Sequence, residues 1–219
     1  MLTCIMPVNM PWYCGVMAGA LSIGIKYLFG GLGNNIFNPA ALSRSILGVL
    51  FTGFSFELFG VTETTLHKVL TGNASLISIE QVLLGNATGG LGTSCFIVIA
   101  CSAILLIAFK VINWENVLFS IASFVLIVWL LMGAEYILPM LLSGSFLFVV
   151  VFMLSDPTTS PYGFTARVLY SLAFGVLAAV FMKYNIMGET AVFLALLVVN
   201  FLAPVFDALF SVFKKGVKN

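Results

Sequence analysis

Long apolar stretches alternate with short polar ones along almost the whole chain, and this alternation is the main structural signal. The stretches approach the roughly 20 residues that a helix needs to cross a membrane. They lack the strict apolar–polar alternation of a transmembrane barrel strand, which excludes that architecture. Because backbone polar groups find no water in lipid, such stretches must form helices. The pattern predicts seven spans, at residues 12–29, 39–59, 94–111, 117–133, 138–154, 167–182 and 190–210.

Composition places the chain in a membrane. Of its 219 residues, 61% are hydrophobic and 8% are charged, whereas a soluble domain has about 25% charged residues. We therefore predict an all-α membrane protein with one polytopic domain, residues 1–219. The four cysteines lack a Cys-x-x-Cys spacing, and the single His67 cannot build a metal site alone. No metal site, catalytic residue or nucleic-acid partner is predicted.

Basic residues set the expected orientation. If the chain starts outside and threads seven helices, seven of the nine lysines and arginines fall on one side, and only Lys68 and Lys183 on the other. Cytoplasmic loops carry the excess of basic residues. The C-terminus is therefore predicted to be cytoplasmic and the long loop at about 60–92 extracytoplasmic. The charges within apolar runs, Arg44 among them, lie near predicted helix ends, where long side chains can reach the interface.

A polar loop at residues 156–161, Asp-Pro-Thr-Thr-Ser-Pro, separates two of the apolar runs. Pro157 and Pro161 prevent a continuous helix here. In one interpretation its hydroxyls bind a flavin or a quinone-like ring, and Asn38 has the equivalent role in the first half of the chain. In the other, the loop is a purely structural turn in which Asp156 caps a helix end. Both interpretations stay open at this point.

Three segments together resemble the RnfD/NqrB family. Residues 30–40, Gly-Gly-Leu-Gly-Asn-Asn-Ile-Phe-Asn-Pro-Ala, resemble its GGLGxNxFNPA signature. Residues 155–161 resemble its TDPVTSP segment, and residues 200–207 resemble its closing AN-x-x-(A/V)-P-L-x-D helix. The order is right, the match covers essentially the whole chain, and the TTSP ending favours RnfD.

The resemblance implies a membrane subunit of an ion-pumping electron-transport complex. It implies a ten-helix fold of two inverted five-helix repeats, similar to urea transporters, of which seven helices would be the C-terminal part. Residues 1–11 look like the tail of a preceding helix, which suggests a missing upstream portion or a short family member; the alternative is a short interfacial segment. The resemblance also implies flavin mononucleotide (FMN) esterified through its phosphate to a threonine, and bound riboflavin in many members.

The family's flavin threonine lies in a D-G-x-S-x-A-T pattern in the long outer loop. The matching stretch is residues 59–65, where Phe59 replaces the aspartate. Thr65 falls on the flavinylated position, Thr64 replaces the alanine and is the fallback, and Thr62 stands for the serine. Lys68 would lie one turn from Thr65 if the segment is helical; in the alternative reading, residues 62–65 only cap a short helix. The further cofactor contacts predicted are Asn38, Asp156, Thr158 and Thr159.

These expectations define a primary function and two rivals. The primary function is a non-autonomous subunit of an Rnf-type ferredoxin:NAD oxidoreductase in a bacterial or archaeal cytoplasmic membrane. It would hold FMN and riboflavin and relay electrons to neighbouring subunits, coupled to Na⁺ or H⁺ transport. The rivals are a solute channel or transporter of the same urea-transporter-like fold, and a divergent paralogue that carries no cofactor.

Overall fold

The structure is a computed structural model that describes residues 1–6, 11–28, 35–52, 92–93, 95–142, 145–186 and 188–216. Its regular elements are helices, and the described part of the chain holds no strand. In chain order they are η1 (Leu2–Ile5), α1 (Trp12–Leu28), α2 (Pro39–Thr52), α5 (Phe96–Ala108), α6 (Trp114–Met132), η4 (Ala134–Tyr136), α7 (Ile137–Leu142), α8 (Phe146–Val149), η5 (Val150–Leu154), α9 (Phe164–Lys183), η6 (Gly188–Thr190) and α10 (Ala191–Gly216).

Three described helices are long and apolar enough to cross a membrane, namely α6, α9 and the Ala191–Leu209 part of α10. A fourth span would consist of two pieces, Ala134–Leu142 and Phe146–Leu154, inclined to each other by 64°. The predicted span at 138–154 coincides with this bent pair. The runs at 39–59 and 94–111 contain the shorter apolar helices Pro39–Leu50 and Phe96–Ala108. A helical membrane protein is confirmed, while the count of seven spans and the inverted repeat stay predictions.

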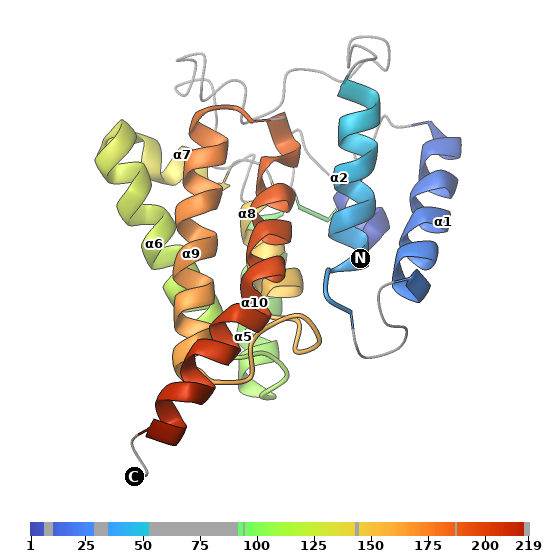
Figure 1. The fold of residues 1–219 in the computed structure, drawn as a ribbon. Coiled ribbons are helices and arrows are strands. Elements are labelled where there is room, and N and C mark those ends of the chain that lie inside the picture. Colours follow the sequence, from blue (N-terminus) through green and yellow to red (C-terminus); the bar gives the residue numbers. More distant parts are fainter. Residues whose placement is uncertain are drawn as a thin grey trace.

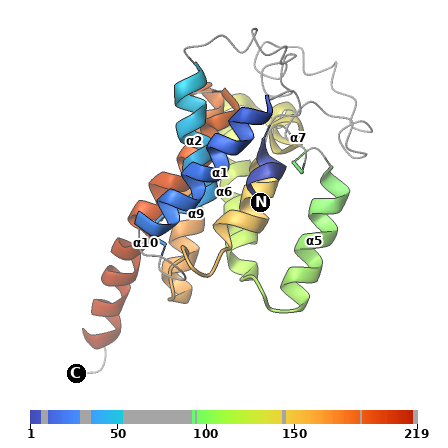
Figure 2. The same ribbon diagram turned by 90° about the vertical axis from the view of Figure 1, so that its right-hand side faces the viewer.

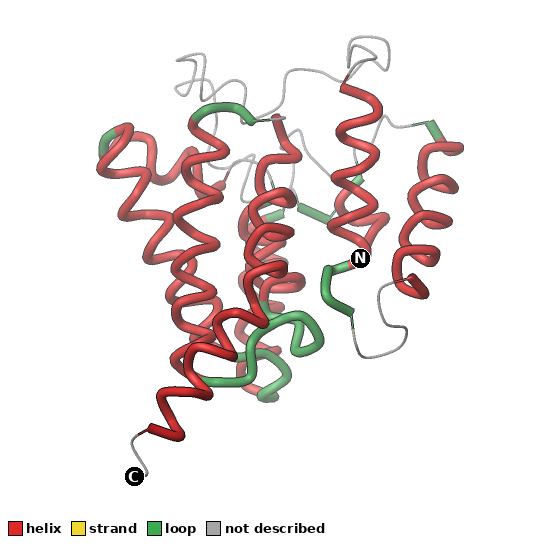
Figure 3. Tube along the Cα trace, viewed as in Figure 1, coloured by secondary structure: helices red, strands yellow, loops and turns green. Residues whose placement is uncertain are grey.

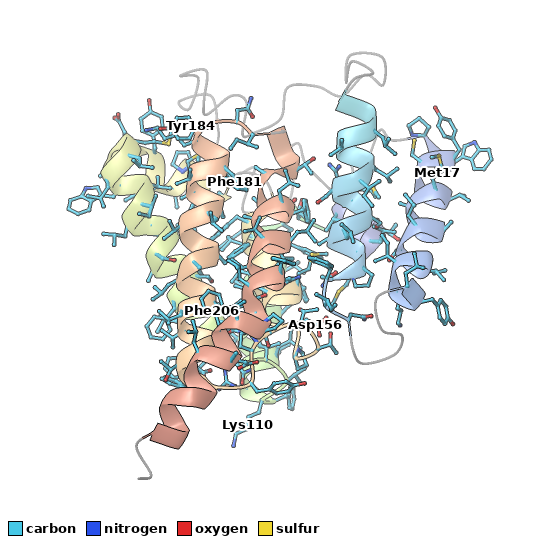
Figure 4. All side chains as sticks on the ribbon, viewed as in Figure 1. Met17, Lys110, Asp156, Phe181, Tyr184 and Phe206 are labelled. Carbon is cyan, nitrogen blue, oxygen red and sulfur yellow. The ribbon has the colours of Figure 1, made fainter. Side chains whose placement is uncertain are left out.

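Successive helices run in opposite directions, as Figures 1 and 2 show. α1, α5 and α10 run toward the end of the bundle where the C-terminus lies, and α2, α6 and α9 run away from it. We call this end the C-terminal end. Loops join α5 to α6 and η5 to α9 there (Figure 3). Lys110 marks the C-terminal end and Tyr184 the opposite end (Figure 4).

The centre of the bundle is built by α9, which packs between α6 and α10. Gly175 of α9 lies so close to α6 that an added Cβ would overlap the Ser123 hydroxyl and main-chain atoms of that helix. Small residues at such positions permit the close backbone approach that membrane helices use for association. The rings of Phe124, Phe146 and Phe174 stack in succession at centroid distances of 3.9 and 5.9 Å and join α6, α8 and α9.

α2 packs antiparallel to α10. Three contacts set the register of this pair: Phe37 with Phe201, Arg44 with Phe193, and Gly48 with Thr190. In this register Asn38, just before α2, lies level with Asn200 in the middle of α10. The pairing therefore brings the end of the 30–40 segment against the start of the 200–207 segment.

The Arg44 side chain is buried inside the described bundle, whereas the sequence suggested that it would extend along the surface toward the interface. This residue is 2% exposed, and its guanidinium carbon lies 5.9 Å from the centroid of the Phe193 ring. Its Nε donates to the Ile5 carbonyl at 3.3 Å. An aromatic face and a carbonyl can hold a cation away from water, so the charge is stabilised within the bundle.

Candidate functional site

The polar loop at 156–161 begins where a widened helical turn ends. η5 is a π-helix, a geometry that is rare and frequent at functional sites. Ser155 closes it by donating its hydroxyl to the Val150 carbonyl at 2.9 Å. Asp156 Oδ1 then accepts from the Thr158 amide at 3.0 Å and from the Thr158 hydroxyl at 2.8 Å. This is an Asx turn, in which a side chain replaces a backbone acceptor.

A carboxylate on α10 holds the far end of the loop. Asp207 accepts from the Tyr162 amide, at 3.1 and 3.2 Å to its two oxygens, and from the Gly163 amide at 3.4 Å. These amides precede the first turn of α9, so the negative charge lies where a helix N-terminus favours it. The last residue of the NFLAPVFD motif thus binds the residues that follow the SDPTTSP motif.

An ion pair fixes the same loop to α6. Arg167 donates from one terminal nitrogen to the Tyr162 carbonyl at 2.8 Å and from the other to Glu115 Oε1 at 2.9 Å. Glu115 is 5% exposed, and a carboxylate at that depth needs a partner. The loop is therefore held between α6 and α10 by two charged side chains.

Asn38 caps α2, the helix that begins at the end of the first motif. It is 3% exposed, and its Oδ1 accepts from the amides of Ala40 at 3.1 Å and Ala41 at 3.3 Å. Pro39, at the first helical position, has no amide hydrogen to satisfy. The carbonyl oxygen of Asn38 is thus engaged by its own helix, and the predicted cofactor contact would have to use its other atoms.

Asn200 and Tyr170 form a hydrogen bond across the α9–α10 interface. The Tyr170 hydroxyl donates to Asn200 Oδ1 at 2.6 Å, and both side chains are fully buried. Figure 4 shows Asp156 set back from the C-terminal end that Lys110 marks.

Three buried donors near the polar loop have no partner among the described residues: the Thr159 hydroxyl, Asn200 Nδ2 and Arg167 Nε. Thr159 is 5% exposed and was predicted as a cofactor contact. Asn200 was not predicted as a site residue. The sequence signal for it was an amide inside an apolar run, four residues before Pro204, because that spacing removes a helix hydrogen bond beside a polar side chain.

The eight predicted site residues thus fall into three groups. Asn38, Asp156 and Thr159 lie in segments that the structure brings together. Thr158 is exposed, and both its amide and its hydroxyl donate to Asp156. The remaining four, Thr62, Thr64, Thr65 and Lys68, lie outside the described residues.

Known proteins match this chain along its whole length. The NQR2, RnfD, RnfE family pattern matches residues 1–215. The chain is 27% identical to the D subunit of the ion-translocating oxidoreductase complex of Stutzerimonas stutzeri, over 94% of this chain and 71% of that protein. It is 26% identical to the D subunit of the Na⁺-translocating ferredoxin:NAD⁺ oxidoreductase complex of Acetobacterium woodii, over 92% of this chain and 66% of that protein.

A third relative belongs to a complex that is named for proton translocation. It is the D subunit of the proton-translocating ferredoxin:NAD⁺ oxidoreductase complex of Clostridium ljungdahlii, 25% identical over 100% of this chain and 73% of that protein. The match over residues 1–215 includes all three motif segments. The chain therefore belongs to the NQR2, RnfD, RnfE family, and the prediction of an RnfD-type sequence is confirmed.

Proposed function

We propose that this chain is the D-type membrane subunit of an Rnf-type ion-translocating electron-transport complex, in which it holds flavin and passes electrons to neighbouring subunits. One observation carries the proposal. The three motif segments are far apart in sequence, yet the third lies on α10 and the other two are held against that helix: Phe37 of the first stacks on Phe201, and Tyr162, which follows the second, donates its amide to Asp207. A structural turn alone would not need two other motifs to be held against the same helix.

The relatives support the ion-coupled part of this function. Those named above belong to ion-translocating complexes, one of them Na⁺-translocating and another proton-translocating. We accordingly propose coupling to one of these two cations. The helix ends that carry Lys26, Lys110 and Arg167 lie at the C-terminal end of the bundle, and basic residues favour the cytoplasmic side. We propose that this end faces the cytoplasm of a bacterial or archaeal cell.

The polar site suits an uncharged flavin ring better than a flavin phosphate. Thr159 and Asn200 present buried donors without partners in the described part of the chain, and ring carbonyls are the acceptors that such donors need. Asp156 and Asp207 bring two carboxylates to the same loop, and the Arg167 guanidinium beside it is paired with Glu115, so a phosphate there would meet like charges. Riboflavin, which has no phosphate, therefore fits this site. FMN is assigned to Thr65 by the sequence motif, with Thr64 as the fallback.

A bound flavin would supply one- and two-electron transfer. The residues of this chain would hold and orient its ring: Asn200 and Thr159 by donation, and Asp156 by acceptance. Burial of the first two keeps water from competing for these hydrogen bonds. The Asp207 and Arg167 contacts fix the loop on which Thr159 and Asp156 lie.

The deciding experiment is to express the whole complex with its flavin transferase and to purify it. We expect a yellow complex with covalent flavin fluorescence on this chain in a denaturing gel, and a mass increase of one FMN on the peptide that contains residues 64–68. Thr65→Val should abolish the fluorescence, and the matched control Thr64→Val should retain it. A colourless complex with that peptide unmodified would overturn the flavin proposal, and solute uptake by vesicles containing the chain alone would then favour the channel function.

A further inference from the structure

The C-terminal end of the α6–α9 interface holds two buried hydrogen-bond donors that no protein group uses. They are Asn116 Nδ2 on α6 and Arg167 Nε on α9, and neither has a partner among the described residues. Asn116 is fully buried, whereas the Arg167 side chain is 18% exposed. Buried donors are normally satisfied, and here the guanidinium that carries one of them still borders solvent.

The contacts of Ser171 and Glu115 bring the two donor residues together. The Ser171 hydroxyl donates to the Arg167 carbonyl at 2.8 Å and to Asn116 Oδ1 at 3.1 Å. Arg167 also donates to Glu115 Oε1 at 2.9 Å, and Glu115 precedes Asn116 on α6. Asn116 and Arg167 are thus linked across the same stretch of the interface twice, once through a hydroxyl and once through a carboxylate.

The polar groups beside these donors can accept a further hydrogen bond. The hydroxyls of Ser120 and Ser171 already donate to carbonyls of their own helices, so each can take part in another contact only as an acceptor. Among the described residues, Arg167 reaches Glu115 Oε1 and no donor reaches Oε2. The missing partner must therefore accept from two donors, and it can donate to a carboxylate oxygen.

Charge and space restrict what this partner can be. The Glu115 carboxylate would repel an anion, and the Arg167 guanidinium would repel a cation. Two turns further along the interface, an added Cβ on Gly175 would overlap Ser123, so the helices leave room only for a small ligand. Water is small and neutral, both accepts and donates, and typically makes about three hydrogen bonds when it is buried.

We propose that α6 and α9 bind an internal water molecule here, which accepts from Arg167 Nε and Asn116 Nδ2 and donates to Glu115 Oε2. The guanidinium is then held at each of its nitrogens, by the Tyr162 carbonyl, by Glu115 and by the water. Asn116 acts through the water as a positioning residue for Arg167, which in turn holds the polar loop at 156–161. This water site is separate from the proposed flavin site and does not depend on it.

The direct test is a cryo-electron microscopy map of the purified whole complex at a resolution that shows ordered water. We expect a peak about 3 Å from both Arg167 Nε and Asn116 Nδ2. A map that shows other internal waters of this chain but none at this position would overturn the inference. So would a map in which both nitrogens donate to protein atoms.

Two substitutions of Asn116 distinguish a bound water from simple packing. Asn116→Leu keeps the approximate size but removes the donor, so the water loses a partner. Asn116→Ser leaves a smaller polar side chain and space that water can refill. Hydrogen exchange at residues 156–163 of the whole complex should be about tenfold faster for Asn116→Leu and less than about threefold faster for Asn116→Ser. Packing alone predicts the reverse order, because leucine fills the space and serine leaves a cavity.

Ser123→Ala is the matched control within the same interface. Ser123 is buried, and its hydroxyl donates to the Ser120 carbonyl of its own helix at 3.1 Å, so its loss should change exchange at residues 156–163 by less than about twofold. Exchange in Asn116→Leu equal to that of the wild type, or faster exchange in Asn116→Ser than in Asn116→Leu, would overturn the inference. If Asn116→Leu lowers the yield of folded complex, the map and the comparison of Asn116→Ser with the control still decide. Covalent flavin on this chain is measured separately, so failure of the water site and failure of the proposed function are distinguishable.

Discussion

The α6–α9 interface and the α9–α10 interface use different polar residues. In α6 and α9 the serines donate to carbonyls of their own helices, Ser120 to Asn116 at 2.6 Å and Ser171 to Arg167 at 2.8 Å. Their hydroxyls are satisfied locally and serve as small residues that let the backbones approach, as Gly175 does. At α10 the polar group is large, and its hydrogen bonding to the described residues is incomplete.

This difference teaches how to read polarity inside a membrane helix. A hydroxyl that is bonded to its own helix is a packing residue, whatever its burial. An amide that is buried, oriented by a neighbour and left with a free donor is a candidate binding group. Asn116 lies between these two classes. Like Asn200, it has a side-chain nitrogen without a partner among the described residues. Unlike Asn200, it lies at the closely packed α6–α9 interface, where its Oδ1 accepts from Ser171.

The variant with the largest expected effect tests whether α6 and α9 are as closely packed as the structure shows. Gly175→Leu would drive a side chain into Ser123 and into main-chain atoms of α6, which cannot move aside as a flexible side chain can. We expect a loss of at least about 3 kcal/mol of stability, seen as a collapse in the yield and thermal stability of the detergent-solubilised protein. Gly24→Leu on α1 is the control, because nothing described lies within 4 Å of its added Cβ. Similar unfolding temperatures for the two variants would refute the close packing.

The next largest effect concerns the charged pair at the C-terminal end of the bundle, between α6 and α9. Arg167→Ala leaves Glu115 buried without this partner and frees the Tyr162 carbonyl. We expect the free energy of unfolding to fall by about 2–3 kcal/mol. This is less than the cost of breaking a fully buried ion pair, because the Arg167 side chain is 18% exposed. Denaturant unfolding measures it. The double variant Glu115→Gln with Arg167→Met should recover part of the loss, and no recovery would show that the arginine acts through other contacts.

A smaller effect should appear in the polar loop alone. Asp207→Ala removes the acceptor for the amides of Tyr162 and Gly163, a capping interaction of about 1–2 kcal/mol. Hydrogen exchange at these two amides should then be about tenfold faster, while exchange in α6 stays unchanged. Asp207→Asn keeps an acceptor oxygen and should give an intermediate rate. Equal protection in all three proteins would mean that the loop is held by Arg167 alone.

The sequence predicted the helices well because lipid leaves so few alternatives for an apolar run. The expected span at 167–182 is α9, Phe164–Lys183, and the one at 117–133 is α6, Trp114–Met132. It did not predict the bend between Leu142 and Phe146, although Ser143, Gly144 and Ser145 interrupt the apolar run there. Hydropathy averages over such a short interruption, whereas a Gly–Ser cluster is a recognised cause of helix kinks.

The site could be predicted only in part, because its contacts join distant residues. Asp156 and Thr159 were found from their own loop, whose prolines and hydroxyls stand out between apolar runs. Asn200 and Arg44 were not, since their partners Tyr170 and Phe193 lie 30 and 149 residues away in the chain. A charged residue near a predicted helix end and an amide in an apolar run each have common harmless explanations, and only the folded contacts decide between them.

The smallest expected effect measures the hydrogen bond that orients Asn200. Tyr170→Phe leaves the Asn200 oxygen without this donor, in addition to the nitrogen that has no acceptor among the described residues. Hydrogen bonds between membrane helices contribute about 0.6 kcal/mol on average and up to about 1.7 kcal/mol, and we expect a loss of about 1 kcal/mol. Asn200→Leu combined with Tyr170→Phe removes both polar groups and should cost less than the sum of the single variants. A double-mutant cycle on the thermal or denaturant unfolding of the flavin-free protein gives this coupling. A coupling energy near zero would mean that the phenol does not orient the amide, and Asn200 would then be a polar residue held by packing alone.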